Sequence, residues 1–394
     1  MRVTRVSGAG GEQFAEEPFS LLDTSGALSR VEAWLGFGPQ PHAAAHRALP
    51  IATYLAATWV APLVLASVQP DRPGAISFMA DFETHLRSFV AIPLLLFAGR
   101  KIDPEVRRIV RSLASARRCR SPVELRAHAR SLQRVVQHPL VKVGLLVLAL
   151  LLVPAWIRQH TSGRETWIFR ADGGRPVLTA AGTWEAYVVV PLYLFLLLRW
   201  TWRWIVLAVL FARSAPLLRP VVSHSDRCGG FAFVSRAPAR FAWVIAGASS
   251  LVSARLLFAI AREDSSAETI ARQAPAVLVL SLAIAFFPLV GFALSFRRFK
   301  RRGLRRYGLI VEGHARHVER VWFRSHPVHV SSEESSSLAD LSSVYENVRA
   351  MRIVPYRRAD LLVVTLAAMT PLLPVLASIA SIDEVLRQLF KALL

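Results

Sequence analysis

Residues Gln273–Phe296 read QAPAVLVLSLAIAFFPLVGFALSF and are followed at once by RRFKRRGLRR. The first stretch contains no charged residue and exceeds the roughly 20 apolar residues with which a helix crosses the hydrocarbon core of a bilayer. The second carries seven basic residues and no acid, a composition typical of cytoplasmic loops of membrane proteins. Together they predict a transmembrane helix whose C-terminal end faces the cytoplasm.

Apolar stretches of similar length recur along the 394-residue chain, which is 53% hydrophobic and only 19% charged. Two further stretches without charges and three that tolerate basic residues are predicted to cross as well: Pro50–Val68, Leu361–Ile382, Leu140–Ile157, Trp184–Phe211 and Phe241–Ala261. A seventh segment, 82–99, includes charged residues and either crosses or dips into the membrane. We therefore predict an all-α membrane protein, a polytopic bundle of six or seven transmembrane helices.

The basic residues set the orientation and explain the formal net charge of +21. Arg100–Arg134 holds eleven basic residues against three acids, so this stretch is predicted to be cytoplasmic. The N-terminus then lies inside if segment 82–99 crosses, and outside if it dips. The predicted divisions are an N-terminal segment (1–49), two membrane segments (50–99), a basic helical insert (100–138), a transmembrane core (139–298), a second cytoplasmic helical insert (299–360) and the last span with a C-terminal helix (361–394).

Two short features complete this outline. Within 158–183, an Asp-Gly-Gly turn separates β-prone Trp167–Phe169 from Val177–Leu178 and predicts an external hairpin. At the C-terminus, apolar residues recur at helical spacing from Ile382 to Leu393 and predict an amphipathic helix in the membrane interface. Anionic lipid headgroups are the expected partners of the basic loops. We expect no cofactor, metal or nucleic acid, and leave a homo-oligomer open.

Charged residues inside the spans are the first candidate functional residues, because each costs about 2.5–3.5 kcal/mol to insert. Those near the outer face are Asp81, Glu83, His85, Arg87, Glu185 and Arg255. One interpretation is ion pairing between neighbouring side chains. Such pairs form within one helix at i,i+4 spacing, as Asp81 with His85 and Glu83 with Arg87, or between helices, for example Glu185 with Arg255. The other is a proton or ion relay, in which His85 titrates near neutral pH.

A second group lies deeper in the predicted span Trp184–Phe211. Arg199 and Arg203 are spaced i,i+4 and share one helical stripe, which should face the bundle interior or a water-filled cavity. Trp200, Trp202 and Trp204 interleave with them, as tryptophans do at a membrane interface. The arginines therefore mark either the inner headgroup region or a cavity that attracts anions.

The third candidate is the loop SHSDRCGGF, residues 223–231. Paired glycines permit positive φ and close backbone approach, so His224, Asp226 and Arg227 could grip an anionic group. The alternative is a connector between two spans, with a local ion pair between Asp226 and Arg227. Adjacency along the chain does not give the geometry of a Ser-His-Asp triad, and we predict no catalytic residue and no enzyme.

Three stretches resemble a family of uncharacterised bacterial multi-pass inner-membrane proteins with an H-x-D-R-x-G-G-type loop. They are RWTWRW at Arg199–Trp204, HSDRCGGFAF at His224–Phe233, and Ser337–Tyr356 with its VRAMRIVPY ending. The resemblance runs from about Arg199 to the end of the chain. Ser225 stands where the family prefers proline, and Phe231-Ala232-Phe233 where it prefers Leu-Gly-Phe. The resemblance implies a topology and a bacterial inner-membrane location, and no established activity.

Two functions remain from the sequence. The first is movement of an anionic solute or ion through a bundle that contains Arg199, Arg203 and Arg255. The alternative is a non-catalytic scaffold or signalling component that uses its basic cytoplasmic inserts. An enzyme acting on lipid phosphates through His224, Asp226 and Arg227 ranks third.

Overall fold

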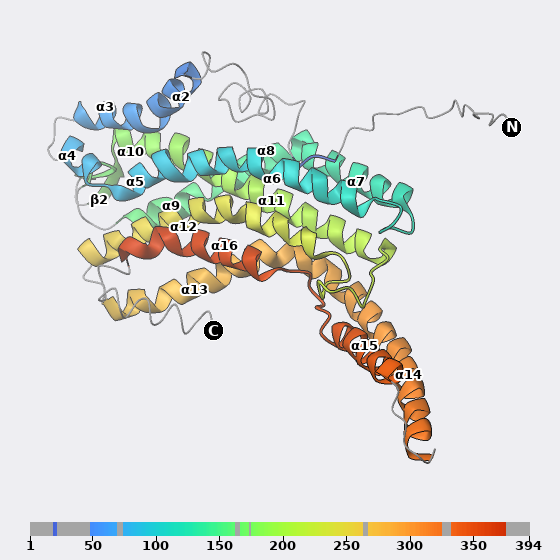
Figure 1. Cartoon of the computed structure of the whole chain (residues 1–394). Helices are drawn as coiled ribbons and strands as arrows, with labels where there is room; N and C mark the ends of the chain where they lie inside the picture. Colours follow the sequence, from blue (N-terminus) through green and yellow to red (C-terminus); the bar gives the residue numbers. More distant parts are fainter. Residues whose placement is uncertain are drawn as a thin grey trace, which may run out of the picture.

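A computed structural model describes most of the chain. The described residues are 19–21, 48–68, 74–161, 166–172, 175–262, 267–324 and 332–375. Almost all of them are helical, and the long helices lie side by side in one bundle (Figure 1). The predicted all-α fold is confirmed. The predicted amphipathic helix at 382–394 lies outside the described residues.

Within the part of the chain that the structure describes, five helices are long and apolar enough to cross a membrane: Pro139–His160, Ala180–Leu217, Ala232–Ile260, Gln273–Arg320 and Arg358–Val375. Each overlaps one of the segments predicted from hydropathy. Ala52–Ser67 is a shorter apolar helix, within the predicted first span. It belongs to a continuous helix built from α2 (Ala48–Leu55), η2 (Ala56–Val60) and α3 (Ala61–Ser67).

The doubtful segment 82–99 belongs to one long helix that packs against α12 (Arg236–Arg262). After the short α4 (Gly74–Met79), α5 (Phe82–Leu86), η3 (Arg87–Ala91) and α6 (Ile92–Leu113) follow without a break. At 1.5 Å per residue this helix is about 48 Å long, more than the roughly 30 Å of a bilayer core. The helix is thus long enough to cross, and it does not turn back as a dipping segment would.

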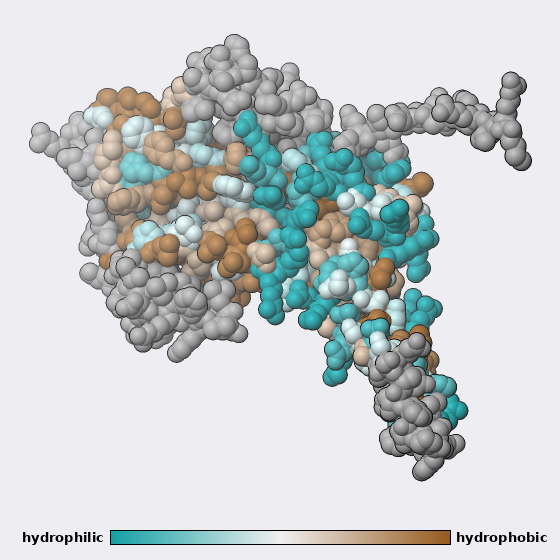
Figure 2. Space-filling view, in the orientation of Figure 1, coloured by the Kyte–Doolittle hydropathy of each residue, from teal (hydrophilic) through white to brown (hydrophobic). Residues whose placement is uncertain are grey.

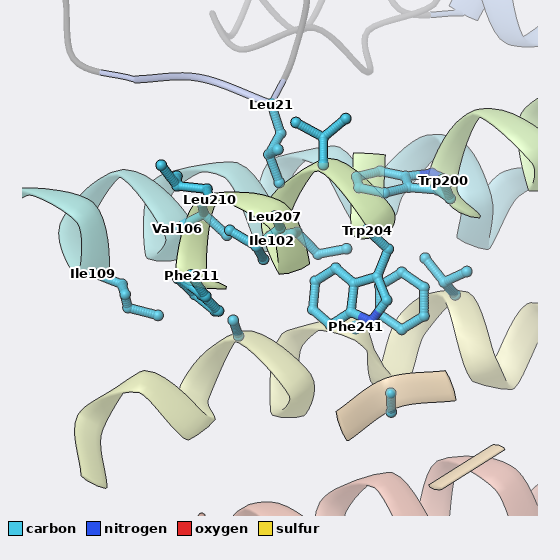
Figure 3. Close-up of a cluster of buried hydrophobic side chains, with 14 of the residues drawn as sticks. Leu21, Ile102, Val106, Ile109, Trp200, Trp204, Leu207, Leu210, Phe211 and Phe241 are labelled. Carbon is cyan, nitrogen blue, oxygen red and sulfur yellow. The ribbon is translucent and has the colours of Figure 1, made fainter. Parts of the chain in front are cut away.

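Residues Phe19–Leu21 contact the basic end of α6. The Ser20 hydroxyl and the Leu21 amide both donate to Asp103 Oδ1, at 2.9 and 2.8 Å. The Leu21 side chain is fully buried beside Ile102 and Val106 (Figure 3). Asp103 lies in the predicted cytoplasmic insert, so residues 19–21 lie at the same end of the bundle. This placement agrees with two crossings between residues 21 and 103.

The middle of the chain contains the basic insert and the first long spans. Its elements are α7 (Pro122–Gln137), α8 (Pro139–Leu151), α9 (Val153–His160), β1 (Phe169–Asp172), β2 (Arg175–Leu178), α10 (Ala180–Trp184), η4 (Glu185–Val189), α11 (Val190–Ser214) and η5 (Ala215–Leu217). The strands pair antiparallel, with Phe169 opposite Leu178, so the hairpin predicted from the Asp-Gly-Gly turn is present. Its side of the membrane stays a prediction.

Three π-helical turns interrupt these helices, and each ends two residues before a proline. They are η2 before Pro62, η3 before Pro93 and η4 before Pro191. A proline inside a helix lacks an N–H and clashes with the carbonyl four residues back, and a wider turn relieves the clash. Side chains from neighbouring helices satisfy some of the carbonyls in these turns. Trp184 Nε1 donates to Ala57 O at 2.8 Å, Ser88 Oγ to Thr58 O at 3.0 Å, and Tyr54 OH to Ser88 O at 2.6 Å.

The C-terminal half completes the bundle. Its elements are η6 (Ala232–Ser235), α12 (Arg236–Arg262), α13 (Ala267–Phe286), η7 (Phe287–Phe292), α14 (Ala293–Arg324), α15 (Ser332–Arg349), α16 (Arg358–Met369) and η8 (Thr370–Leu372). The 3₁₀ turns η7 and η8 contain Pro288 and Pro371, which cannot donate to the helical hydrogen-bond ladder. A Cβ on Gly291 would lie 2.7 Å from Ala212 N. Glycine therefore lets η7 pack directly against the α11 backbone.

One large apolar core joins α6, α11, α12 and the segments that cover them. Its centre holds Trp204 stacked on Phe241, with ring centroids 4.0 Å apart (Figure 3). The face of the molecule that Figure 2 shows divides into two halves. Apolar side chains cover one half of the bundle, and hydrophilic side chains gather over the end from which α14 emerges (Figure 2). Burial of the first half in lipid explains its composition.

Candidate functional site

The outer polar residues converge on Arg87. The guanidinium of Arg87 bonds Glu83, one turn away on α5, and Glu185 at the start of η4. Arg87 is 2% exposed and Glu185 is 0% exposed. The predicted pairing of Glu83 with Arg87 is confirmed. The example pairing of Glu185 with Arg255 is wrong, because η3 and η4 bring Glu185 to Arg87.

His160, at the end of α9, extends this ion-pair cluster to a third helix. Its Nε2 lies 3.2 Å from Glu83 Oε2, and its Nδ1 lies 2.8 Å from the Trp156 carbonyl. The Trp156 ring stacks on His160 and lies 5.7 Å from the Arg87 guanidinium carbon. Glu185 Oε2 is buried without a hydrogen-bond partner among the described residues. The cluster of Glu83, Arg87, His160 and Glu185 therefore ties three membrane helices together around two carboxylates and one fixed cation.

Asp81 and His85 do not form the side-chain pair that their spacing suggested. Asp81 caps α5, accepting from the Glu83 amide at 3.0 Å, and its other oxygen accepts from Trp167 Nε1 at 2.9 Å. His85 Nδ1 accepts from Trp59 Nε1 at 3.0 Å, and its Nε2 lies 3.1 Å from the Met79 carbonyl. Asp81 thus holds the hairpin against α5, and His85 links α5 to the first helix.

Arg255 lies on α12, which packs against α5 and η3. Its guanidinium carbon is 5.4 Å from the centre of the Phe258 ring, and it is near enough to act electrostatically on Glu83. Arg255 therefore adds positive charge on the α12 side of the cluster. Within the cluster, Arg87 is paired with two carboxylates, those of Glu83 and Glu185.

Arg199 and Arg203 face inward from α11, as their stripe predicted. Both are buried, and with Lys142 of α8 they line a narrow cleft between α8, the end of α7 and α11. The interior has about 10 Å³ of free space, which is about the room that one water molecule needs. The Arg203 guanidinium carbon lies 4.9 Å from the centre of the Trp200 ring. Trp200 is itself fixed, because its Nε1 donates to Leu95 O at 2.7 Å.

The loop 223–231 is folded around the carboxylate of Asp226. Asp226 Oδ1 accepts from the amides of Cys228 and Gly230 at 2.8 and 3.0 Å, and Oδ2 from Ala232 at 3.2 Å. His224 Nδ1 lies 3.0 Å from Oδ1. Partial burial alone would raise the pKa of Asp226, but the three backbone N–H groups and His224 outweigh it and hold the pKa below its usual value. The carboxylate is thus a structural anion that organises the connector.

Positive φ angles make this fold of the loop possible. They occur at Arg227 (54°), Gly229 (65°) and Gly230 (85°), which turns successive amides toward the carboxylate, as in an anion-binding nest. A Cβ on Gly229 would lie 2.8 Å from Pro220 Cβ, so only glycine fits there. The side chain of Arg227 is exposed, and Asp226 takes its hydrogen bonds from the backbone, where the sequence suggested an ion pair with Arg227.

The same loop holds the start of α16 and the base of α14. The Arg352 amide donates to Arg227 O at 2.7 Å, and Arg352 Nη1 donates to Tyr356 O at 2.7 Å. Lys300 Nζ donates to Met351 O at 2.8 Å. Burial, and then the Asp226 charge, raise the pKa of the Cys228 thiol to about 11, so the thiol stays protonated at neutral pH. We call the loop 223–231 with 351–356 the joint.

Comparison with known proteins gives no match at any level: no known family, no curated protein and no solved structure matches the chain. The resemblance to the bacterial membrane-protein family therefore rests on its quoted stretches and stays a prediction. The geometry nonetheless assigns two of those stretches to definite places. RWTWRW lines the cleft and core of α11, and HSDRCGGFAF forms the joint.

Sequence reasoning missed His160, Trp59 and Trp167 as members of the outer network, and Lys142 as a member of the cleft. The position of His160 could have indicated its role, because it lies at the end of an apolar span, at the same predicted depth as His85 on another helix. Lys142 was a charge inside a predicted span. The tryptophans gave none, since only packing of the hairpin and first helix against α5 brings their N–H groups to Asp81 and His85.

Proposed function

We propose that this integral membrane protein is a non-catalytic scaffold or signalling component of the bacterial inner membrane. It presents the helical hairpin α14–α15 to an acidic protein partner in the cytoplasm. The single observation that carries the proposal is the hairpin itself, which packs as a pair and projects from the bundle (Figure 1) at its hydrophilic end (Figure 2). Its length and exposure exceed what a connection between two spans requires.

The hairpin is held at its base, as a docking element must be if it is to present a fixed surface. A Cβ on Gly303 of α14 would meet Val222 at 2.9 Å and Val348 at 3.2 Å, so α14, α15 and the residue that precedes the joint are in contact there. Lys300 adds its bond to the Met351 carbonyl. These contacts support a positioned platform, in contrast to a mobile tether.

The chemistry of the exposed face supports an acidic partner with an apolar anchor. α14 exposes six arginines and no acid over its first turns outside the apolar stretch: Arg297, Arg298, Arg301, Arg302, Arg305 and Arg306. Immediately beyond them Leu309 is 72% exposed, beside exposed Ile310. Arginine next to large apolar side chains is typical of protein interfaces. The distal hairpin points away from the apolar half of the surface (Figure 2), which favours a soluble partner over lipid.

Replacing Leu309 by aspartate should weaken partner binding strongly, because it removes the anchor and adds repulsion toward acidic groups. We expect full-length protein in neutral-lipid nanodiscs to retain one acidic soluble protein stoichiometrically from its own cells, with affinity reduced at least tenfold in Leu309→Asp. Val123→Asp is the matched control, since Val123 is equally exposed at 72% on α7. Calorimetry with the purified partner measures both.

Two results would contradict the proposal. If the hairpin retains only anionic vesicles or unspecific polyanions, and Leu309→Asp has no effect, the basic run serves the membrane surface alone. If the purified protein is a dimer that Leu309→Asp dissociates, the partner is a second copy of the chain.

Anion movement is the second candidate function, favoured by the charge of Lys142, Arg199 and Arg203 around one cleft. In reconstituted vesicles, Arg203→Gln should then reduce an anion-dependent flux at least tenfold, and Arg213→Gln, at an exposed position of the same helix, should not. A wild-type protein without flux above empty vesicles would exclude this function and leave the scaffold proposal intact.

A further inference from the structure

His160 faces a hydrogen-bond acceptor on each side of its ring. Its Nδ1 lies 2.8 Å from the Trp156 carbonyl oxygen, which can only accept, so Nδ1 carries a hydrogen. Its Nε2 lies 3.2 Å from Glu83 Oε2, and an ionised carboxylate is also only an acceptor. A neutral imidazole has one N–H, so it would turn the lone pair of Nε2 toward Glu83.

One additional proton makes both contacts favourable. On Nε2 it converts His160 to an imidazolium, which donates to the Trp156 carbonyl and to Glu83 Oε2. The ring is also stacked on the Trp156 indole, with ring centroids 4.3 Å apart, and the face of an indole attracts a cation. The geometry therefore fits the protonated form of His160.

The charge of the buried cluster leads to the same assignment. Glu83 and Glu185 both bond the guanidinium of Arg87, and Glu185 Oε2 is buried without a hydrogen-bond donor among the described residues. With His160 neutral, the four side chains of the cluster carry one negative charge in excess. With His160 protonated, their formal charges cancel, which matters because unbalanced charge is costly in a medium of low dielectric.

The surroundings of the cluster do not remove this excess. Its charged or titratable neighbours on other elements and on α9 are Asp81 before α5, Tyr193 of α11, Arg255 of α12 and exposed Arg158 of α9. Asp81 and Arg255 have opposite charges, and a phenol is uncharged at neutral pH. Arg158 is exposed, so its charge is screened by water and salt.

His85 differs from His160, although the sequence made His85 the expected titrating group. Its Nδ1 accepts from Trp59 Nε1, and its Nε2 lies 3.1 Å from the Met79 carbonyl. One partner is a donor and the other an acceptor, so a neutral imidazole satisfies both. The proton therefore belongs at His160.

We propose that His160 Nε2 and Glu83 Oε2 form a proton-binding site at the end of the bundle that carries the β1–β2 hairpin. The two side chains are 16% and 15% exposed, so the proton comes from water and returns to it without opening of the core. The bound proton resides on the imidazole and ties α9 to α5, and its loss releases that tie. The inference does not depend on the hairpin α14–α15 or its partner.

Solid-state nitrogen NMR of histidine-labelled, full-length protein in neutral-lipid nanodiscs tests the site, because ring-nitrogen shifts distinguish an imidazolium from the two neutral tautomers. The resonances missing from His160→Gln identify His160. We expect both ring nitrogens of His160 to carry a hydrogen at low pH, and Nδ1 to keep its hydrogen as the pH is raised. Glu83→Gln removes the anion but keeps the shape, so it should lower the proton affinity of His160 about tenfold. His317→Gln, at an exposed position of α14, should leave it unchanged.

Three results would overturn the proposal. The first is a His160 that stays neutral from about pH 5 to 8, the range in which histidines ordinarily change charge. The second is a neutral form with its hydrogen on Nε2, and the third is equal proton affinity in wild type and Glu83→Gln. A carboxylic-acid band in the infrared spectrum that Glu83→Gln abolishes, beside a neutral His160, would assign the proton to Glu83. If Glu83→Gln fails to fold, the titration and the tautomer of the wild-type protein still decide.

Discussion

Replacing Arg87 by alanine should destabilise the bundle by about 3–5 kcal/mol, the usual cost of removing one partner from a buried ion pair. Arg87 bonds both Glu83 and Glu185, so its loss leaves two carboxylates without the cation that neutralises them in the membrane. The free energy of unfolding, measured by denaturant titration in detergent micelles, checks the size of the loss. Arg111→Ala, at an exposed position of the same helix, should change it by less than about 0.5 kcal/mol.

A double-mutant cycle separates the pair from its surroundings. In Arg87→Gln with Glu185→Gln, the buried carboxylate of Glu185 is removed together with its cation and only Glu83 is left without Arg87, so the loss should be smaller than the sum of the single losses. Additive losses would show that Arg87 and Glu185 do not interact in the folded protein. The same variants test the relay interpretation, since flux that survives in Arg87→Gln excludes Arg87 from any ion pathway.

Asp226→Ala should destabilise the joint. The carboxylate satisfies the amides of Cys228, Gly230 and Ala232, and each buried donor left without a partner costs about 1–3 kcal/mol. We expect a loss of about 3 kcal/mol in stability. Hydrogen exchange should show faster exchange of the amides of the joint, 228–232 and 351–356. Protection unchanged from wild type would contradict the role assigned to Asp226.

The charge of Asp226 gives this prediction a pH dependence. Since the pKa is lowered in the folded protein from an unfolded value of 3.8, its contribution is complete above pH 3.8 and is lost as the pH falls through the lowered pKa. At neutral pH, Asp226→Asn keeps one acceptor oxygen and should cost less than Asp226→Ala. Ser225→Ala, at the exposed neighbouring position, is the control and should leave exchange unchanged.

The spans could be predicted from sequence because hydrocarbon imposes its demand on each helix separately. Gln273–Phe296 is apolar whatever its neighbours are, and so is Leu140–Ile157. The pairing of Glu83 with Arg87 was also accessible, since both lie on one helix at i,i+4 spacing. Local signals thus yield local structure.

Contacts between helices could not be predicted from the sequence, because they depend on how the helices are arranged relative to one another. Glu185 had two arginines at the same depth, Arg87 and Arg255, and only the order of helices around the bundle decides between them. The joint is similar. Asp226 before paired glycines indicates a tight turn. The sequence around Arg352, however, does not indicate that the Arg352 amide donates to Arg227 O. Such partners depend on packing that no periodicity encodes.

The widened turns before Pro62, Pro93 and Pro191 have a mechanical consequence. Carbonyls in η2 and η3 accept bonds from side chains of other helices, so the main chains of these two turns are tied to neighbouring segments where each turn interrupts its helix. A tilt of one segment must strain the others. The region around Arg87 should therefore move as a single rigid block. If the end of the molecule that bears α14 and α15 moves, the bundle should bend outside this region.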